Sequence, residues 1–210
     1  MGTYKALPAG FYRRPADVVA GDLLGRFIVR QLGGQRLVAR IVETEAYLGR
    51  KDRASHAWGG RRTPRSRVLY SPPGTAYVYL IYGIYHCLNA VTGDSTDGDA
   101  VLIRAAEPLR GISTMVAHRS LLANPRDGDL TGGPGKLCQA LAIDRRHNAR
   151  TLTRGGLRLT EGTPVAQREI VTGPRIGIDY AGDARLWPLR FAIVGNRHVS
   201  RPYPKVDPGS

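Results

Sequence analysis

The sequence predicts a mixed α/β (α+β) fold in a single compact domain. Its 210 residues, of which 42% are hydrophobic, are enough to bury one core. Alternating apolar segments indicate strands, and shorter segments bounded by Pro or Gly indicate helices. No repeat, low-complexity tract or change of composition divides the chain. We therefore expect one domain over residues 1–210, with its core at about 11–200 and a loose tail at 202–210.

Eight segments are expected to be strands, because their apolar residues alternate or because short apolar runs lie between turn residues. The Gly33-Gly34 pair predicts a turn between the first two strands. Tyr82-Gly83 predicts another turn between the fourth and the fifth, which would form a hairpin. In chain order, the expected strands are 26–31, 36–48, 68–70, 75–81, 84–91, 101–105, 175–178 and 189–194.

Three segments are expected to be helices. Pro15 precedes the first and Gly25 follows it, which is the usual punctuation of a helix. Pro108 stands in the first turn of the second. A loop rich in Gly, Pro and Asp leads into the third helix, and its length is greater than a simple connection in a compact domain needs. The expected helices are 16–24, 107–117 and 136–142, and the expected loops are 50–67, 124–135 and the basic stretch 145–158.

The chain is strongly basic, with 31 Lys and Arg against 17 Asp and Glu, a formal net charge of +14 and a pI near 10.4. This balance predicts a polyanionic partner, and arginine, the dominant cation, both grips phosphate and stacks on aromatic rings. Charge alone leaves three alternatives open: a nucleic-acid-binding protein, a merely basic enzyme and a ribosome-associated factor.

The cysteine content and the hydropathy pattern predict a soluble intracellular protein. Cys87 and Cys138 are too few for a disulfide framework and form no CxxC pair, which predicts buried thiols in a reducing compartment. Residues 1–10 contain no apolar segment of the signal-peptide type. Residues 74–91 carry no formal charge, but their tyrosines, Asn89 and His86 argue against a membrane span.

No metal or cofactor is expected. The five histidines have no ligand spacing with either cysteine. The segment 132–136, Gly-Gly-Pro-Gly-Lys, fails the pattern of a nucleotide phosphate loop because Leu130 and Leu137 occupy positions that need Gly and Ser or Thr. The free amides and Lys136 at the start of this helix could still hold a DNA phosphate.

Four tyrosines crowd the uncharged segment 74–91. Tyrosine is a good strand former and pairs across sheets, so some of them can be purely structural. Tyr82 stands beside Gly83 at the predicted turn, and an exposed aromatic side chain there could act as a wedge between base pairs. The pattern leaves both interpretations open for Tyr77, Tyr79, Tyr82 and Tyr85.

Glu43 and Glu45 lie on one face of the expected strand 36–48. In one interpretation they are surface charges paired with arginines such as Arg40 or Arg104. In the other, one carboxylate lies close to nucleic acid, where phosphate repels it, because it has a chemical task. Alternation assigns Ile41, Glu43, Glu45 and Tyr47 to this face and Val42, Thr44, Ala46 and Leu48 to the other.

Several blocks of the sequence, in the right order, resemble the alkyladenine (3-methyladenine) DNA glycosylase family. The resemblance begins at Phe11-Tyr12 and extends to about Ser200. The blocks are RIVETEAYLG at 40–49, His56, TPRSR at 63–67, PGTAYVYLIYG at 73–83, CLN at 87–89, VLIRAAEP at 101–108, Gly133-Pro134 through Leu141, and RIGI at 175–178.

The resemblance implies a curved, largely antiparallel sheet with flanking helices and a protruding β-hairpin. It also implies an enzyme that rotates a damaged (alkylated or deaminated) purine out of duplex DNA, hydrolyses its glycosidic bond with a water activated by glutamate, and leaves an abasic site. By matching positions, the implied roles are water activation by Glu45, support of that water by Arg104 and the backbone carbonyl of Ile176, base binding by Tyr47, His56 and Tyr79, exclusion of guanine by Asn89, and intercalation by Tyr82.

The expected partner is double-stranded DNA that contains damaged purines, and the expected form is a cytoplasmic, nucleoid-associated monomer. The matching blocks hold no lysine in the place of an amine nucleophile, which implies a monofunctional glycosylase. Two other functions stay open: a non-catalytic nucleic-acid binder and an RNA-modifying enzyme that flips its target base. Candidates for phosphate binding are Arg61, Arg62, Arg65, Arg67 and Lys136.

Overall fold

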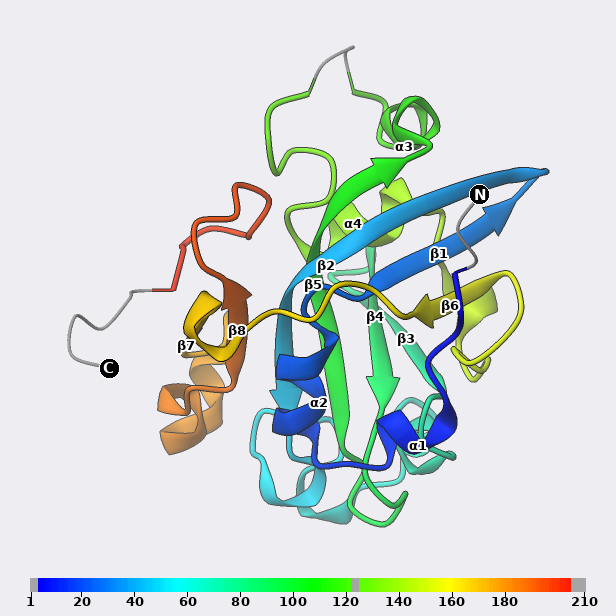
Figure 1. Cartoon of the computed structure of the whole chain (residues 1–210). Helices are drawn as coiled ribbons and strands as arrows, with labels where there is room; N and C mark the ends of the chain where they lie inside the picture. The colour runs from blue at the N-terminus through cyan, green and yellow to red at the C-terminus, as the bar shows by residue number, and fades with distance from the viewer. Residues whose placement is uncertain (1–3, 122–124, 205–210) are drawn as a thin grey trace.

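The computed structural model describes residues 4–121 and 125–204, and within them it is built on one antiparallel sheet with few helices (Figure 1). The α-helices are α1 (Ala9–Tyr12), α2 (Ala16–Leu23), α3 (Ile112–His118) and α4 (Pro134–Ala140). The strands are β1 (Phe27–Leu32), β2 (Gln35–Tyr47), β3 (Ala76–Ile81), β4 (Tyr85–Val91), β5 (Ala100–Arg110), β6 (Leu157–Thr160), β7 (Ile170–Gly173) and β8 (Arg190–Ile193).

The long strand β2 organises the sheet. The strand order is β3-β4-β5-β2-β1-β6, and every pairing is antiparallel. One edge of β2 pairs with β5, while its other edge pairs first with β1 and then, at Glu43 to Glu45, with β8. Strand β7 pairs only with β8, at the left of Figure 1. The predicted α+β class with a curved antiparallel sheet is confirmed.

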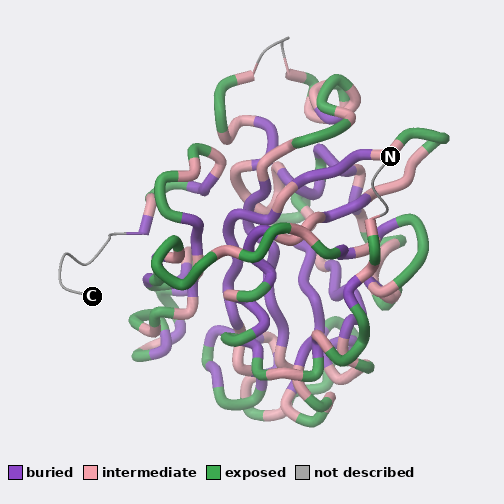
Figure 2. Tube along the Cα trace, viewed as in Figure 1, coloured by how far each residue is buried: buried purple, intermediate pink, exposed green. Residues whose placement is uncertain are grey.

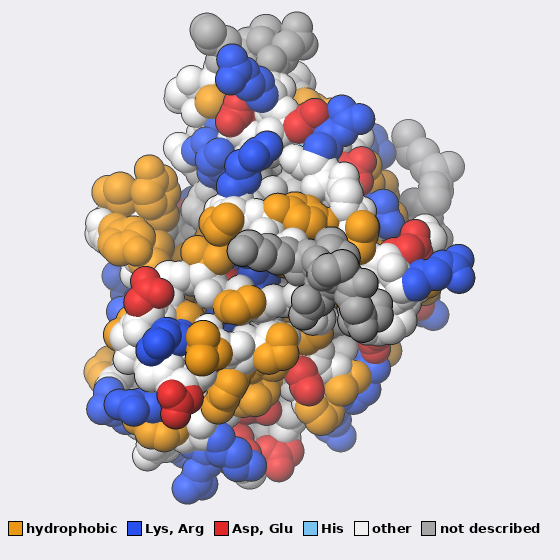
Figure 3. All heavy atoms as spheres, turned by 90° about the vertical axis from the view of Figure 1, so that its left-hand side faces the viewer, with side chains coloured by type: hydrophobic (Ala, Val, Ile, Leu, Met, Phe, Trp, Pro, Cys, Tyr) orange, Lys and Arg blue, Asp and Glu red, His pale blue; other side chains and the backbone are white. Residues whose placement is uncertain are grey.

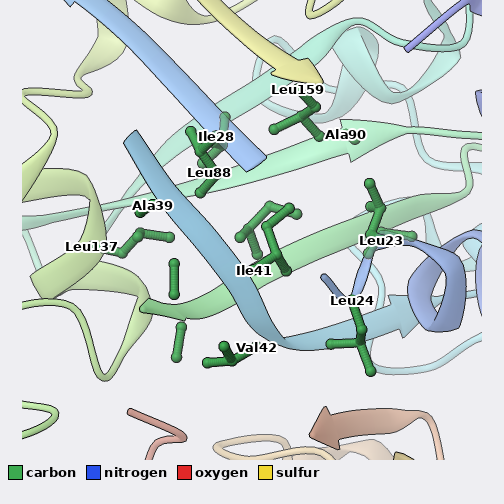
Figure 4. Close-up of a cluster of buried hydrophobic side chains, with 14 of the residues drawn as sticks. Leu23, Leu24, Ile28, Ala39, Ile41, Val42, Leu88, Ala90, Leu137 and Leu159 are labelled. Carbon is green, nitrogen blue, oxygen red and sulfur yellow. The ribbon is translucent and has the colours of Figure 1, made fainter. Parts of the chain in front are cut away.

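The main core fills the concave side of the curled sheet. Leu23 of α2 and Leu137 of α4 are fully buried and meet Ile28, Ile41 and Leu88 from three strands (Figure 4). Burial of such a side chain is worth roughly 1.5–3 kcal/mol. Figure 2 shows the strands buried and the connecting turns exposed. Within the described part of the chain, no helix is both long and apolar enough to cross a bilayer.

Strand β2 is bulged where its two carboxylates stand. Its register with β5 shifts between Ile41 and Glu43 and again between Glu43 and Thr44. A bulge adds a residue to one strand and so breaks the strict alternation of faces. The prediction that Ile41 shares the face of the glutamates is therefore wrong, since Ile41 packs in the main core together with Val42.

Two sequence-based assignments in the middle of the chain are wrong. Residues 68–70 belong to a 3-10 helix, η3 (Ser66–Tyr70), rather than to a strand. The helix expected at 107–117 begins only at Ile112, because residues up to Arg110 continue β5 and pair with β2. Pro108 is tolerated there because it stands at a register shift, where the ladder is already irregular.

The C-terminal third also differs from the prediction. Residues 175–178 form no strand: Gly177 has a φ of +76°, and the backbone bends through the segment. The strand of this region is β7, and β6 begins at Leu157, inside the basic stretch 145–158 that was expected to be rich in turns. Asn124, the first residue of the expected loop 124–135, lies outside the described residues, as do residues 205–210 of the expected tail.

Candidate active site

A cavity of about 460 Å³ opens between the β3–β4 hairpin, the segment 54–69 and the segment 176–180. Its size suits a small ligand such as a nucleobase. Its lining is rich in aromatic side chains and includes two arginines, Arg65 and Arg104. The lining residues are Tyr47, Ala54, His56, Arg65, Leu69, Tyr77, Tyr79, Ile81, Tyr82, Tyr85, Cys87, Asn89, Leu102, Arg104, Pro134, Gly135, Ile176, Gly177, Ile178 and Tyr180.

Three rings form one wall of this cavity. Strand alternation in β3 places Tyr77 and Tyr79 on the same face, with ring centroids 5.2 Å apart. The imidazole of His56 meets Tyr79 edge-on at 4.7 Å, and its Nδ1 lies 2.8 Å from the Tyr77 hydroxyl. The hydrogen bond fixes the imidazole, so that the wall is a rigid aromatic surface on which a planar base can stack.

Both polar groups of this wall are neutral near pH 7. Burial and, to a lesser degree, the nearby charge of Arg65 lower the pKa of His56 to about 4. Burial raises the pKa of the Tyr77 hydroxyl to about 12. His56 therefore offers a hydrogen bond to a ligand in the cavity rather than an ionised imidazole.

The lowered pKa of His56 predicts a pH-dependent stability. Between pH 6.5 and 4 the unfolded chain protonates this residue and the folded chain does not, so His56 lowers the stability as the pH falls through this window. Above pH 6.5 the penalty is absent. We expect the His56→Asn variant to lose less melting temperature than the parent between pH 6.5 and 4. Thermal unfolding measures this difference, and equal losses of melting temperature in the two proteins would contradict a lowered pKa for His56.

Glu45 is fully buried and is not itself a lining residue of the cavity, but it is bonded to three residues that are. One carboxylate oxygen accepts the backbone N–H of Ile176 at 2.8 Å and lies 3.3 Å from Nη1 of Arg104. The other accepts the hydroxyl of Tyr47 at 2.8 Å. All three donor residues line the cavity, so the carboxylate lies directly behind that lining. The interpretation of Glu45 as a surface charge is wrong.

Glu43 is also fully buried, and it organises the groups behind the site. Its Oε1 accepts Nε of Arg190 at 2.6 Å and Nε of Arg104 at 3.2 Å. Ser200 donates both its backbone N–H, at 2.8 Å, and its hydroxyl, at 2.9 Å. Arg104 thus bridges the two glutamates, whereas Arg40, the other expected partner, lies 3.8 Å from Glu107.

A second buried ion pair supports Tyr47. Arg175 and Asp52 are both fully buried and make a two-pronged contact, with Nη2 of Arg175 at 2.9 Å from Oδ1 of Asp52. The guanidinium of Arg175 stacks on the ring of Tyr47 at 4.7 Å and donates to the Ala46 carbonyl. This pair joins segment 46–52 to the loop that carries Ile176, and the resemblance assigned no role to it.

The hairpin tip is strained and exposed. Tyr82 adopts a φ of +53° and is 82% exposed, and Gly83 follows with a φ of +73°. A side chain rarely occupies this left-handed region, where Asn or Gly is usual in a tight hairpin. Ile84 beside it is 67% exposed. Figure 3 shows hydrophobic side chains projecting from the surface at its left-hand edge, with Lys and Arg side chains above and below them.

Asn89 stands on β4 opposite Tyr77 and is only 3% exposed. Its Nδ2 donates to the Tyr77 carbonyl at 3.1 Å, which fixes the orientation of the amide in the cavity wall. The sequence analysis did not anticipate Cys87, Leu102, Gly135 and Tyr180 as lining residues. Close packing favours a glycine at position 135, because a Cβ there would lie 3.0 Å from the Tyr85 ring.

The five candidates for phosphate binding differ in their surroundings. Arg61, Arg62 and Arg67 are exposed, and the guanidinium of Arg62 lies 4.1 Å from the centre of the Tyr70 ring. Arg65 lines the cavity, stacks on Tyr79 at 4.8 Å and donates to the Leu80 carbonyl. Lys136 contacts the Gly128 carbonyl at 3.3 Å and Asp129 at 3.8 Å, so its charge is already partly compensated.

An aromatic cavity in front of a buried carboxylate, next to an exposed aromatic turn on a basic protein, fits the class of enzymes that act on nucleic acid. The model of the Methylpurine-DNA glycosylase (MPG) family matches residues 10–197, and the chain belongs to this family. It is therefore a DNA glycosylase, a hydrolase of base-excision repair whose substrate is DNA.

Curated relatives from bacteria are similar over almost their whole length. One from Myxococcus xanthus is 49% identical over 195 residues, which are 93% of each chain. One from Desulfitobacterium hafniense is 44% identical over 93% of this chain and 98% of its own. One from Anaeromyxobacter dehalogenans is 49% identical over 94% and 88%. Each of these proteins is named "Putative 3-methyladenine DNA glycosylase".

Proposed function

We propose that this chain excises 3-methyladenine and other damaged purines, hypoxanthine among them, from double-stranded DNA by hydrolysis. The observation that carries the proposal is Glu45, held by three donors directly behind the lining of an aromatic, base-sized cavity. We further propose that the protein acts as a monomer in the cytoplasm, where it meets the nucleoid.

Base binding is assigned to the aromatic wall. Each base stacked on an aromatic ring gains roughly 1–3 kcal/mol, which is on the scale of the few kcal/mol that extrusion costs. Tyr79 and Tyr47 would hold the faces of the base, and His56 would read its edge through Nε2, for which no partner is found among the described residues. Asn89, held by Tyr77, would crowd the exocyclic amine of guanine.

Water activation is assigned to Glu45. Each carboxylate oxygen can accept more than one hydrogen bond, so a water can join the donors already present. We place this water between Arg104 and Ile176, whose backbone carbonyl would be a further contact. The oxygen of the water bonds to C1′ of the sugar, and the electron pair of the broken glycosidic bond leaves with the base. The proton of the water passes to Glu45.

The same carboxylate would stabilise the positive charge that develops on the sugar. At about 4 Å and an effective dielectric constant near 20, this attraction is roughly 4 kcal/mol before desolvation is counted. An alkylated purine is itself cationic and leaves without an acid. A neutral base such as hypoxanthine needs a hydrogen bond as it leaves, and we assign this role to the neutral imidazole of His56, which lines the cavity.

The product should be an intact strand with an abasic site. Among the described residues that line the cavity there is no lysine to form a covalent adduct with the sugar. We expect a duplex with one 3-methyladenine or hypoxanthine to release the free base, with nicks only after alkali. Strand cleavage without alkali, together with an adduct trapped by borohydride, would contradict this mechanism. RNA substrates of the same sequence test whether the enzyme is restricted to DNA.

Tyr82 is assigned to the gap that the extruded nucleotide leaves, which would offset part of the cost of extrusion. We expect Tyr82→Ala to lower base release about tenfold from a fully paired duplex, a loss within the 1–3 kcal/mol range of one aromatic stack. Release from a single strand, where no gap must be filled, should change little. The matched variant Tyr82→Phe should behave like the parent. Equal losses on both substrates would instead indicate a folding defect.

A further inference from the structure

The basic stretch 145–158 forms a second feature that the base-excision site does not use. It holds five arginines and no Asp or Glu: Arg145, Arg146, Arg150, Arg154 and Arg158. The stretch follows the outer edge of β3. The N–H of Ala149 donates to the Ala76 carbonyl at 2.9 Å, and the N–H of Ala76 donates to the Arg150 carbonyl at 2.7 Å. These bonds hold the arginines against the sheet.

Two adjoining hollows, of about 460 and 560 Å³, lie along this stretch. Because they share Arg150, Thr151 and Arg154, we treat them as one surface and call it the arginine groove. In the described part of the chain, neither hollow is lined by an acidic residue. The lining residues are Ala9, Arg30, Pro72, Pro73, Thr75, Arg146, His147, Ala149, Arg150, Thr151, Thr153, Arg154, Gly155, Gly156 and Leu157.

The positive charge of the arginine groove is largely uncompensated. Arg146 pairs with Asp144, but Arg150 and Arg154 are exposed and make no side-chain hydrogen bond or ion pair with the described residues. The Nε of Arg30 is buried and also has no partner there. A planar guanidinium without a partner, placed beside hydroxyl groups such as that of Thr151, suits a phosphate group.

The arginine groove lies away from the base-excision cavity. Their linings share no residue in the described chain. In Figure 1 the stretch around residue 150 is at the right, next to β6, whereas residues 176–180 of the cavity wall are at the left. The groove flanks the Ala76 end of β3, and Tyr82 follows the opposite end, about 20 Å farther along the strand.

We propose that the arginine groove binds the phosphates of a second DNA segment, separate from the segment that carries the lesion. A duplex with Tyr82 inserted meets the tip of the hairpin, about 20 Å along β3 from the groove, and this separation leaves room for a second duplex to lie beside the first. The position of the first duplex at the hairpin tip is the one part of this proposal that rests on the proposed intercalation of Tyr82. A site of this kind lets the enzyme contact a neighbouring duplex before it leaves the first.

The test is the stoichiometry of binding to lesion-free duplexes of about 12 base pairs, each about 40 Å long and so no longer than the protein is wide. In sedimentation experiments at low salt, we expect the full chain to bind two duplexes. The double variant Arg150→Gln/Arg154→Gln should bind one duplex. For its overall binding, the slope of log K against log salt should become less steep by about 2, one for each arginine removed.

Matched variants separate the site from bulk charge. Arg126→Gln/Arg168→Gln removes the same charge from exposed positions outside the groove and should still bind two duplexes. Arg150→Lys/Arg154→Lys should also keep the second duplex. The proposal is overturned if the parent binds one duplex, if the Arg126/Arg168 variant loses the second equally, or if single-stranded RNA of the same length occupies the second site in preference to the duplex.

Base release from one short lesion duplex is measured in parallel. We expect it to stay within about twofold of the parent in the Arg150/Arg154 variant, because two exposed contacts outside the cavity contribute only non-specific affinity. If the parent protein releases the base normally but binds only one duplex, the second DNA site is refuted and the proposed function is not affected. If it binds two duplexes but releases no base from any lesion, the proposed function is refuted and the second DNA site is not affected.

Discussion

Replacing Glu45 by Gln should remove base excision while DNA binding stays the same or becomes tighter. Glutamine has nearly the same shape and its carbonyl can still accept the N–H of Ile176, so the cavity should persist. It cannot take a proton from water, and general-base catalysis is worth on the order of 10²–10⁴ in rate. Loss of the negative charge also removes repulsion from phosphate. Single-turnover release of 3-methyladenine, together with binding to the same duplex, measures both effects.

Glu161→Gln is the matched control for this variant. Glu161 is half-exposed, pairs with Lys5 at 3.1 Å on the surface and makes no contact with the cavity, so base release should be unchanged. If Glu45→Gln keeps more than about a tenth of the parental rate, a loss smaller than general-base catalysis supplies, another group activates the water. If both rate and binding vanish and the melting temperature drops sharply, Glu45 serves the fold rather than the chemistry.

Replacing Glu43 by Ala should destabilise the protein by about 3–5 kcal/mol, because the buried guanidinium of Arg190 loses its counter-charge and that of Arg104 keeps only Glu45. Arg104 and Arg190 both donate to this carboxylate, and Ser200 loses two hydrogen bonds as well. For a chain of this length we expect the melting temperature to fall by about 10 °C. Thermal unfolding and urea unfolding measure the loss independently.

The exposed pair of Asp127 with Arg197, 3.0 Å apart, provides the control. Asp127→Ala breaks an ion pair that water already screens and should change the stability by less than about 1 kcal/mol. Glu43→Gln keeps the volume and some hydrogen bonds, so its loss should lie between the two. A Glu43→Ala variant as stable as Asp127→Ala would show that the buried network contributes nothing. Reduced base release in folded Glu43→Gln would indicate that Glu43 positions Arg104.

Much of the strand pattern was predictable from the sequence, because strands alternate and Gly pairs mark hairpin turns. The strands around Gly33-Gly34 and Tyr82-Gly83 and the helix after Pro15 are confirmed. The errors fall where tertiary pairing overrides local signals. Pro108 marks a helix start by itself, but strand β2 offers that segment hydrogen-bond partners and holds it extended through Arg110.

The candidate site could be listed from the sequence only in part. Blocks that resemble the family supplied Glu45, Arg104 and the tyrosines; the structure brings the tyrosines and Arg104 to one cavity and buries Glu45 behind its lining. Nothing local marked Arg190 or Ser200 as partners of Glu43, since they stand 147 and 157 residues away along the chain. The structure also adds a contact at Ile176 that was not expected, because its backbone N–H donates to Glu45.

The sequence alone determined the class of fold, the basic surface, the hairpin with Tyr82 at its turn and the family, because these depend on residue type and on spacing along the chain. Only the tertiary structure decided that both glutamates are buried and that Arg104 joins them. It also decided that the basic stretch 145–158 becomes a groove away from the cavity. Burial and charge pairing depend on which distant segments meet, and spacing along one strand carries no information about that.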